Sequence, residues 1–299
     1  MGFSSVDALY NAITVDGKIL TVPFVRTINT GATSAAGRWH ECFATANGTG
    51  GQGVLTGTAG AGIAFSSSTV GALPIGPTVE TSMTKHLLSM MAVSNSATIA
   101  PATLMLTDII HVYPSCVLTG TPSTLSNHPT WSGSGDTRMT NPKGVQASVF
   151  ATTATTAGNG QITLTYVDQD NNSAQAQTGS LYANSTTHPI GAAYAQTNAV
   201  VTVGGLNMAM GAGDYGVKQV NSYAINTGGT AGVGAIVLHR PVCTIPIPLA
   251  NLPAERDFTT GPIRLPRIYD GACLALFVCI GGALTTNQNL QGELVFGWG

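Results

Sequence analysis

Charged residues are scarce in this sequence. The 299 residues include 11 Lys and Arg and 13 Asp and Glu, or 8% of the chain, against roughly 25% in an ordinary soluble protein. The formal net charge is −2, and no basic run occurs. Because phosphate contacts require clustered Lys and Arg, we expect no direct nucleic-acid partner. So little charge also favours association. We expect that other copies or other proteins cover part of the surface, or that neutral Thr, Ser and Asn side chains keep the chain in solution.

Long apolar runs are absent as well. No window supplies the ~20 apolar residues of a membrane-spanning helix. The first ten residues, MGFSSVDALY, lack the basic and apolar regions of a secretory leader. The sequence therefore predicts no membrane partner and folding in the compartment where the chain is synthesised.

Cysteine is too rare and too irregularly spaced to form a disulfide framework. Three of the five cysteines lie within apolar runs, where a free thiol behaves as a small hydrophobic side chain. The five are Cys42, Cys116, Cys243, Cys273 and Cys279. We expect reduced, buried thiols and a reducing compartment.

Catalytic and metal-binding motifs are missing too. There is no Gly-x-Ser-x-Gly elbow, no His-x-x-x-His and no Cys-x-x-Cys pair. The Gly-rich segment 48–53 lacks the Lys of a phosphate-binding loop. The acidic turn at 168–173 lacks the central Gly and the final Glu of an EF-hand. A pair of glycosidase carboxylates among the 13 acids stays open. We expect a non-enzymatic protein with no cofactor and no metal.

What the sequence does contain is a long apolar run near its C-terminal end, at residues 272–280. Gly281 and Gly282 end this run, a polar tip follows, and a second apolar stretch reaches Trp298. Nine apolar residues bounded by glycines are typical of a strand that is covered on both faces. We predict a core hairpin made of these two stretches.

A short helix is predicted near the N-terminal end, over residues 6–14. Ser4 or Ser5 can cap it, and Asp7 suits its first turn. Its apolar face consists of Val6, Leu9, Tyr10 and Ile13. Because so short a helix is not stable alone, it must dock on its own domain or on a neighbouring subunit.

Strands account for most of the remaining pattern. They are predicted over residues 19–28, 38–43, 103–113, 144–156, 161–167, 199–203, 216–225 and 232–238, and residues 84–93 fit a helix or a strand. In the 103–113 strand, Asp108 and His111 are three residues apart and point to opposite faces, so we expect edge or interface positions for them.

This arrangement predicts a mainly β protein. We expect an antiparallel β-sandwich, jelly-roll-like, with a short N-terminal helix and long loops. Residues 1–17 would form an N-terminal helical arm and residues 18–299 the β-sandwich domain. An internal boundary in the 115–144 connection stays open.

Two segments are candidates for contacts with a partner. The 115–144 connection has too few apolar residues to bury itself, so we expect a neighbour to order it, with Trp131 as the anchor. The path over residues 240–268 contains six prolines and is predicted to run extended along the surface. The candidate interface residues are Trp131, Asp136, Arg138, Lys143, Arg256, Arg264 and Arg267.

A resemblance rests on several stretches taken together. These are KGVQA at 143–147, GDYGV at 213–217, the ending from LPRIYDGAC at 265–273 to Trp298 and Gly299, the SVDAL start at 5–9, and the 103–113 strand. Together they resemble virion structural proteins of tailed bacteriophages over most of the chain. The resemblance implies a non-enzymatic particle component, such as a head decoration, or cement, protein. Such proteins are typically β-rich and often trimeric.

We therefore expect a bacteriophage capsid decoration protein that binds and stabilises the assembled shell. Its expected partners are itself, as a homo-oligomer with a trimer favoured, and the major capsid protein or other virion proteins. It would be synthesised in the host bacterial cytoplasm and reside in the virion. Alternatives are a major tail-tube or other tail structural protein, and a carbohydrate-binding receptor module. A receptor module would need clustered aromatic side chains, but only 6% of the residues are aromatic.

Overall fold

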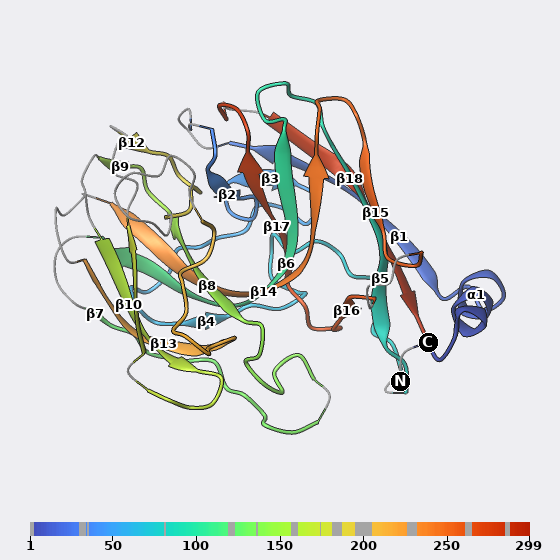
Figure 1. Cartoon of the computed structure of the whole chain (residues 1–299), viewed down its shortest axis with the longest axis horizontal. Helices are drawn as coiled ribbons and strands as arrows, with labels where there is room; N and C mark the ends of the chain where they lie inside the picture. Colours follow the sequence, from blue (N-terminus) through green and yellow to red (C-terminus); the bar gives the residue numbers. More distant parts are fainter. Residues whose placement is uncertain are drawn as a thin grey trace.

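A computed structural model gives the fold of the chain. It describes residues 3–29, 34, 36–80, 82–118, 123–135, 137–156, 161–173, 175–180, 187–194, 205–225, 232–260, 265–284 and 288–299. Within these ranges the protein is mainly β, with one short helix, α1 (Val6–Thr14). The antiparallel sheets form a sandwich-like arrangement (Figure 1). The predicted fold class is confirmed.

The described residues form three larger sheets, and every strand pair within these sheets is antiparallel. Sheet 1 has the order β15 (Ala254–Asp257), β5 (Lys85–Ser94), β18 (Gln288–Trp298), β1 (Ile19–Ile28), β3 (Ala46–Gly48), and β16 (Arg267–Ile268) also pairs with β5. Sheet 2 has the order β2 (Trp39–Glu41), β17 (Leu274–Ile280), β6 (Ala102–Val117), β14 (Val233–Ile247), β8 (Gln146–Ala151), and β4 (Ile63–Ala64) also pairs with β6. Sheet 3 has the order β11 (Gln175–Ser180), β10 (Gln161–Asp168), β13 (Val217–Ile225), β7 (Ser123–Thr124). A small separate ladder joins β9 (Thr155–Thr156) to β12 (Thr187–His188).

Three connections cross from one sheet to the other at the same end of the strands. β5 continues into β6, β14 into β15, and β17 into β18. The order β15-β5-β18 in sheet 1 is repeated as β14-β6-β17 in sheet 2, so neighbours in one sheet stay neighbours in the other. Main-chain hydrogen bonds join the crossings, from Asn251 to Ser94 (2.8 Å) and from Gly281 to Ile99 (3.1 Å). The chain is therefore rolled in the manner of a jelly roll.

The cores follow from this layering. Sheets 1 and 2 enclose the first apolar cluster, which includes Phe24, Leu87, Leu276 and Leu294. Sheets 2 and 3 enclose a second, which includes Ile110, Leu164, Val220 and Ile236. The long strands β6 and β14 contribute to both clusters. The division of the chain into an arm and one domain, with a boundary left open at 115–144, stays a prediction.

The C-terminal run forms core strands, but the predicted hairpin is wrong. β17 is buried on both faces, because Leu276 lies in the first cluster while Phe277 packs in a third cluster under the loops that hold Phe43 and Phe65. β18, however, pairs with β1 and β5 in the other sheet. Gly281 and Gly282, which predicted a hairpin turn, lie instead where the chain crosses from sheet 2 to sheet 1. Gly281 is required there, because a Cβ at this position would lie 2.1 Å from the Pro101 carbonyl oxygen.

The proline-rich path also differs from the prediction. β14 continues to Ile247 and includes Pro241 and Pro246, whereas a surface path was expected from residue 240. β8 pairs with β14 only from Gly234 to His239, so the part that holds the prolines has β6 on one side alone. Proline is tolerated where a strand lacks its second neighbour, because its missing N–H has no ladder bond to lose.

Several other predictions have clear outcomes. The 19–28 strand is present as β1 with the predicted bounds, and residues 85–94 form a strand rather than a helix. The predicted 199–203 strand lies outside the described residues. The expectation that Asp108 and His111 occupy edge positions is wrong, because both are buried and β6 is a central strand of sheet 2. All five cysteines are free, four of them buried and Cys279 half-buried.

The N-terminal helix has the predicted bounds and cap. The Ser5 hydroxyl accepts a hydrogen bond from the Ala8 N–H at 3.0 Å. α1 lies at one end of the molecule, beside β18 (Figure 1). Its only buried residue is Ala12, while Val6 is 79% and Tyr10 is 64% exposed. The helix is thus attached along one side and leaves part of its apolar face in solvent.

Candidate functional site

The predicted anchor, Trp131, contacts its own chain. Its indole Nε1–H donates to the Lys218 carbonyl oxygen at 2.9 Å, and its half-buried ring packs against the second core. The loop that follows is closed by main-chain hydrogen bonds from Ser132 to Met139 (2.8 Å) and from Gly133 to Thr140 (3.1 Å). These bonds hold the described part of the connection against its own chain, and the expected contact of Trp131 and this connection with a neighbour stays a prediction.

Arg138 fixes the connection to the body. Its guanidinium forms a bidentate ion pair with Asp108 of β6, with Nε donating to Oδ2 at 2.8 Å and Nη2 donating to Oδ1 at 2.7 Å. It also donates to the carbonyl oxygens of Phe65 (2.6 Å) and Ile109. Burial raises the pKa of Asp108, and the hydrogen bond and charge of Arg138 oppose that rise. This pair joins a loop to the central strand of sheet 2.

Arg240 lies beside the pair of Asp108 and Arg138. In the register of β14 and β6 it lies opposite Asp108. Its Nη groups donate to the carbonyl oxygens of Arg138 (3.2 Å) and Asn141 (2.9 Å). Burial lowers the pKa of Arg240, while the charge of Asp108 acts in the opposite direction. Two arginines from distant parts of the chain thus hold one loop against the same carboxylate.

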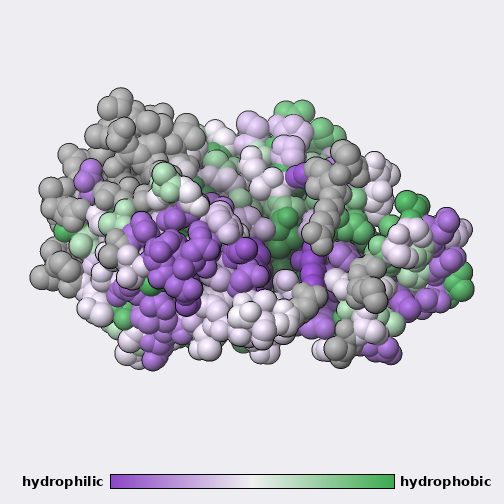
Figure 2. Space-filling view, turned by 60° about the horizontal axis from the view of Figure 1, so that its bottom comes forward, coloured by the Kyte–Doolittle hydropathy of each residue, from purple (hydrophilic) through white to green (hydrophobic). Residues whose placement is uncertain are grey.

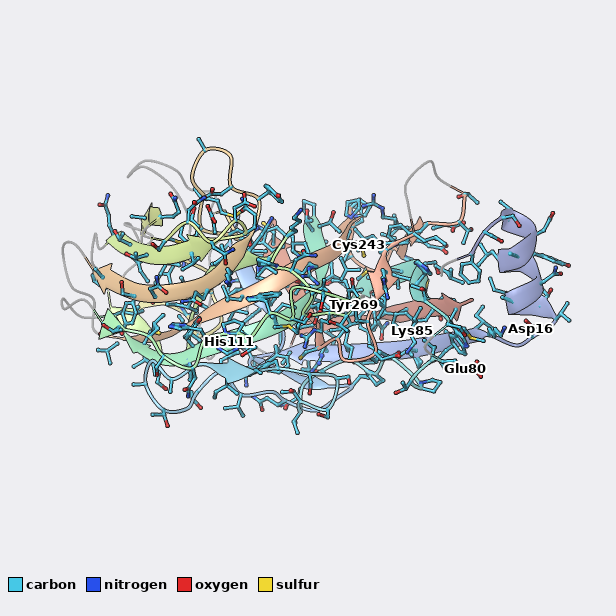
Figure 3. The ribbon with its side chains drawn as sticks, turned by 90° about the horizontal axis from the view of Figure 1, so that it is seen from below. Asp16, Glu80, Lys85, His111, Cys243 and Tyr269 are labelled. Carbon is cyan, nitrogen blue, oxygen red and sulfur yellow. The ribbon has the colours of Figure 1, made fainter. Side chains whose placement is uncertain are left out.

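A second group of charges flanks this cluster along β16. The Arg267 guanidinium lies 4.5 Å from the centre of the Tyr269 ring, a cation–π contact. The buried Lys85 ammonium contacts Asp270 at 2.8 Å and donates to the Pro77 carbonyl oxygen at 2.7 Å. Figure 3 shows Lys85 and Tyr269 near each other in the middle of the molecule, away from the end marked by Asp16.

A cleft connects the two groups. One cavity of about 340 Å³ adjoins another of about 540 Å³, and both are lined by Thr137, Arg138, Arg267, Ile268 and Tyr269. Among the described residues, the first cavity is lined by four cationic side chains, Arg138, Lys143, Arg240 and Arg267, and by the carboxylate of Asp108. Five of the chain's 11 Lys and Arg line the two cavities, once Lys85 is included. In a chain with so little charge, this cleft is the candidate functional site.

The structure brings together some of the predicted residues and separates others. Arg138, Lys143 and Arg267 line the same cavity. Arg256 donates to the Thr244 carbonyl oxygen at 2.9 Å and lies over the Phe258 ring, so it is engaged elsewhere. Asp136 and Arg264 lie outside the described residues.

The sequence analysis expected Asp108 at an edge or interface position and did not include Asp108, Arg240 or Tyr269 among the candidate site residues. A signal was available for the first of these, because Asp108 interrupts a long apolar strand and a buried carboxylate requires a partner. Nothing in the sequence pointed to Arg138 as that partner, since 30 residues separate the two.

No group of three or more His, Cys, Asp and Glu side chains is placed to hold a metal ion among the described residues. Within the same residues, no helix is long and apolar enough to cross a membrane.

Comparison with known proteins was made against families, curated sequences and solved structures. No family model matches. No curated protein matches either. Among solved structures, the VP2 subviral particle of infectious bursal disease virus aligns over 93% of this chain and 80% of its own, at 7% identity and a TM-score of 0.18. The structure of the Gt strain of the same virus aligns over 94% and 80%, at 8% identity and a TM-score of 0.16. These scores are too low to bear on fold or function.

Proposed function

We propose that this chain is a non-enzymatic structural component of a bacteriophage virion, and specifically a capsid decoration protein. The observation that carries the proposal is a surface with few charges that leaves large apolar side chains of α1 in solvent. Such side chains gain free energy when a neighbour covers them, at roughly 25 cal/mol per Å². The sequence resemblance to virion proteins of tailed bacteriophages supports the same class.

The mechanism would be adhesion. The rolled sandwich supplies a rigid body, because its long strands share two cores and its loops are fastened by buried arginines. Copies of such a body that bind only the assembled shell stabilise it by mass action. Neither step requires a reactive group.

Labelling of particles tests the proposal. Antibody raised against the recombinant chain, coupled to gold, is expected to mark the heads of purified virions. Virions assembled without the chain are expected to release DNA at a lower temperature and to regain stability when the purified chain is added. Gold over the tail would favour a tail structural protein instead, and virions without any label would overturn the proposal.

A further inference from the structure

One long stretch of the chain has no charged side chain. Residues 42–79 contain no Asp, Glu, Lys, Arg or His. They form loops and the short strands β3 and β4, and their buried side chains Phe43, Leu55 and Phe65 pack into the third cluster. We call residues 42–79 the uncharged cover, because they lie over that cluster.

Most of the uncharged cover is surface. Over residues 47–70, 21 of the 24 residues are exposed or half-buried. A protein interface of standard size uses about 20–30 residues and ~800 Å² on each partner. Three apolar side chains of the cover lie in solvent: Val54 is 58%, Ile63 is 41% and Val70 is 64% exposed. The cover therefore has the extent of one half of a stable interface.

Hydrogen bonds hold the cover in one conformation. Arg26 of β1 donates to the carbonyl oxygens of Gly51 (2.6 Å) and Gly71, which lie in separate segments of the cover. These segments are in contact, since a Cβ on Gly51 would lie 3.2 Å from the Val70 side chain. Because the surface is preformed, binding a partner would cost little ordering entropy.

The charges of the surface lie elsewhere. On the face shown in Figure 2, hydrophilic residues gather toward the middle. The outer face of sheet 1 is acidic, because Glu293 of β18 and Glu255 of β15 are both paired with Met91 of β5. Their neighbour Leu294 points into the first core, so these carboxylates point outward. Two copies that met through this face would bring like charges together, which is unfavourable.

The lack of charge on the cover restricts what can bind it. A charged protein surface would lose water there and find no counterion. A nucleic acid would find no Lys or Arg for its phosphates. A second copy of this chain meets neither difficulty, because only 8% of its residues are charged and its own cover has no charge.

We propose that the uncharged cover of one copy packs against the uncharged cover of a second copy, with Val54 and Val70 at the contact. This deepens the proposed function, on which it rests, by naming the surface that joins copies of the chain. Three covers that meet about one axis would give the favoured trimer.

Self-association of the full-length chain tests the contact. Light scattering over a range of protein concentrations gives the concentration at which half of the chains are associated. Val70→Lys places a charge in the contact and is expected to raise this concentration at least tenfold. Leu249→Lys, at a 63% exposed position outside the cover, is the control and is expected to leave it unchanged. Both variants should keep the melting temperature of the parent, because both positions are exposed.

A mixture of opposite charges shows whether the cover meets a second cover. Val70→Glu alone is also expected to associate at least tenfold more weakly than the parent. An equal mixture of Val70→Glu and Val70→Lys is expected to associate at least threefold more strongly than either variant alone, because opposite charges then face each other. The measurement uses about 0.01 M salt, where the Debye length is about 30 Å and spans the contact.

Three results would overturn the inference: a parent that stays monomeric, a Val70→Lys variant that associates like the parent, or a mixture that associates no better than its components. Any of them could occur while gold labelling still marks the virion head, in which case the proposed function would stand and this contact alone would fall. The expected charge effects, with virions that carry no label, would support the contact and reject the virion role.

Discussion

Buried polar side chains join segments of this protein that are far apart in sequence. Arg26 of β1 donates to the carbonyl oxygens of Gly51 (2.6 Å) and Gly71, and so holds two loops over the sandwich. Asp108 and Arg138 do the same for the connection after β7. Because a buried charge without a partner is costly, the loss of one member should cost far more than the loss of an exposed pair.

Asp108→Asn should therefore destabilise the protein by about 3–5 kcal/mol, because it leaves the Arg138 charge buried without its counterion. Chemical denaturation gives the unfolding free energy. Asp16→Asn is the matched control, since it breaks the largely solvent-accessible pair with the half-buried Lys18 and should cost less than about 1 kcal/mol. Equal losses for the two variants would contradict a stabilising role for the buried pair.

His239 should make stability depend on acid pH. Its imidazole is fully buried, with Nδ1 2.7 Å from the Thr107 hydroxyl and Nε2 2.9 Å from the Ser148 hydroxyl. Burial lowers its pKa from 6.5 to about 3. Between these two pKa values the imidazole is protonated in the unfolded chain but neutral in the folded chain. The unfolding free energy is therefore unaffected by His239 above pH 6.5 and decreases as the pH falls from 6.5 toward 3.

The His239→Gln variant measures this effect. The advantage of the parent in unfolding free energy should shrink by up to about 1.4 kcal/mol per pH unit below pH 6.5. Glu41 changes the unfolding free energy in the opposite direction with pH, because burial raises its pKa to about 7. Its contribution is the same in the parent and in the variant, so it cancels in the difference between them. A difference that stays constant from pH 7 to pH 4 would show that His239 does not titrate differently in the folded state.

Among the elements, β17 is a strand buried along nearly its whole length. Leu276→Asp places a carboxylate between sheets 1 and 2 and should prevent soluble folding, because the loss exceeds about 4 kcal/mol. Leu249→Asp, in the exposed connection between β14 and β15, should fold normally. Soluble yield and thermal melting compare the two. A folded Leu276→Asp with unchanged melting would refute the central position of β17.

The crossing from β17 to β18 allows a second test of an element. Gly281→Ala places a Cβ 2.1 Å from the Pro101 carbonyl oxygen and should destabilise the fold by about 1–3 kcal/mol. Gly271→Ala is the control, because its nearest neighbour is the Arg138 Cδ at 4.0 Å. Denaturant midpoints that move equally for both variants would mean that the crossing has room to relax.

Sequence patterns predicted individual elements much better than their pairing. The period of β1 and the cap of α1 are local signals, and both elements have the predicted bounds. The partners of β17 and β18 are set by contacts with strands about 165 or more residues earlier in the chain, which no local pattern records. For the same reason, the sequence suggested Arg138 and Lys143 as contact residues but could not place Arg240 and Tyr269 beside them.

At the scale of the whole molecule, we expect the purified chain to be a homo-oligomer, with a light-scattering mass of three times 30.4 kDa for the favoured trimer. Trp131→Ala should leave that mass unchanged and lower the melting temperature instead, because the indole contacts Lys218 of its own chain. A monodisperse monomer at micromolar concentration would contradict the oligomer. An oligomer that dissociates on Trp131→Ala would show that Trp131 contributes to the contact between copies.

The pairing of β1 with β18 has a consequence for synthesis. β1 occupies residues 19–28, and its long partner occupies residues 288–298. Likewise, β5 pairs with β18 and β6 pairs with β17, so both strands precede their partners by a long stretch of chain. A ribosome delivers these partners much later than the strands they cover, so the first apolar strands stay uncovered in the meantime, when aggregation competes with folding. The first core can close only after β17 and β18 emerge, and nascent chains should therefore depend on protection by chaperones until then.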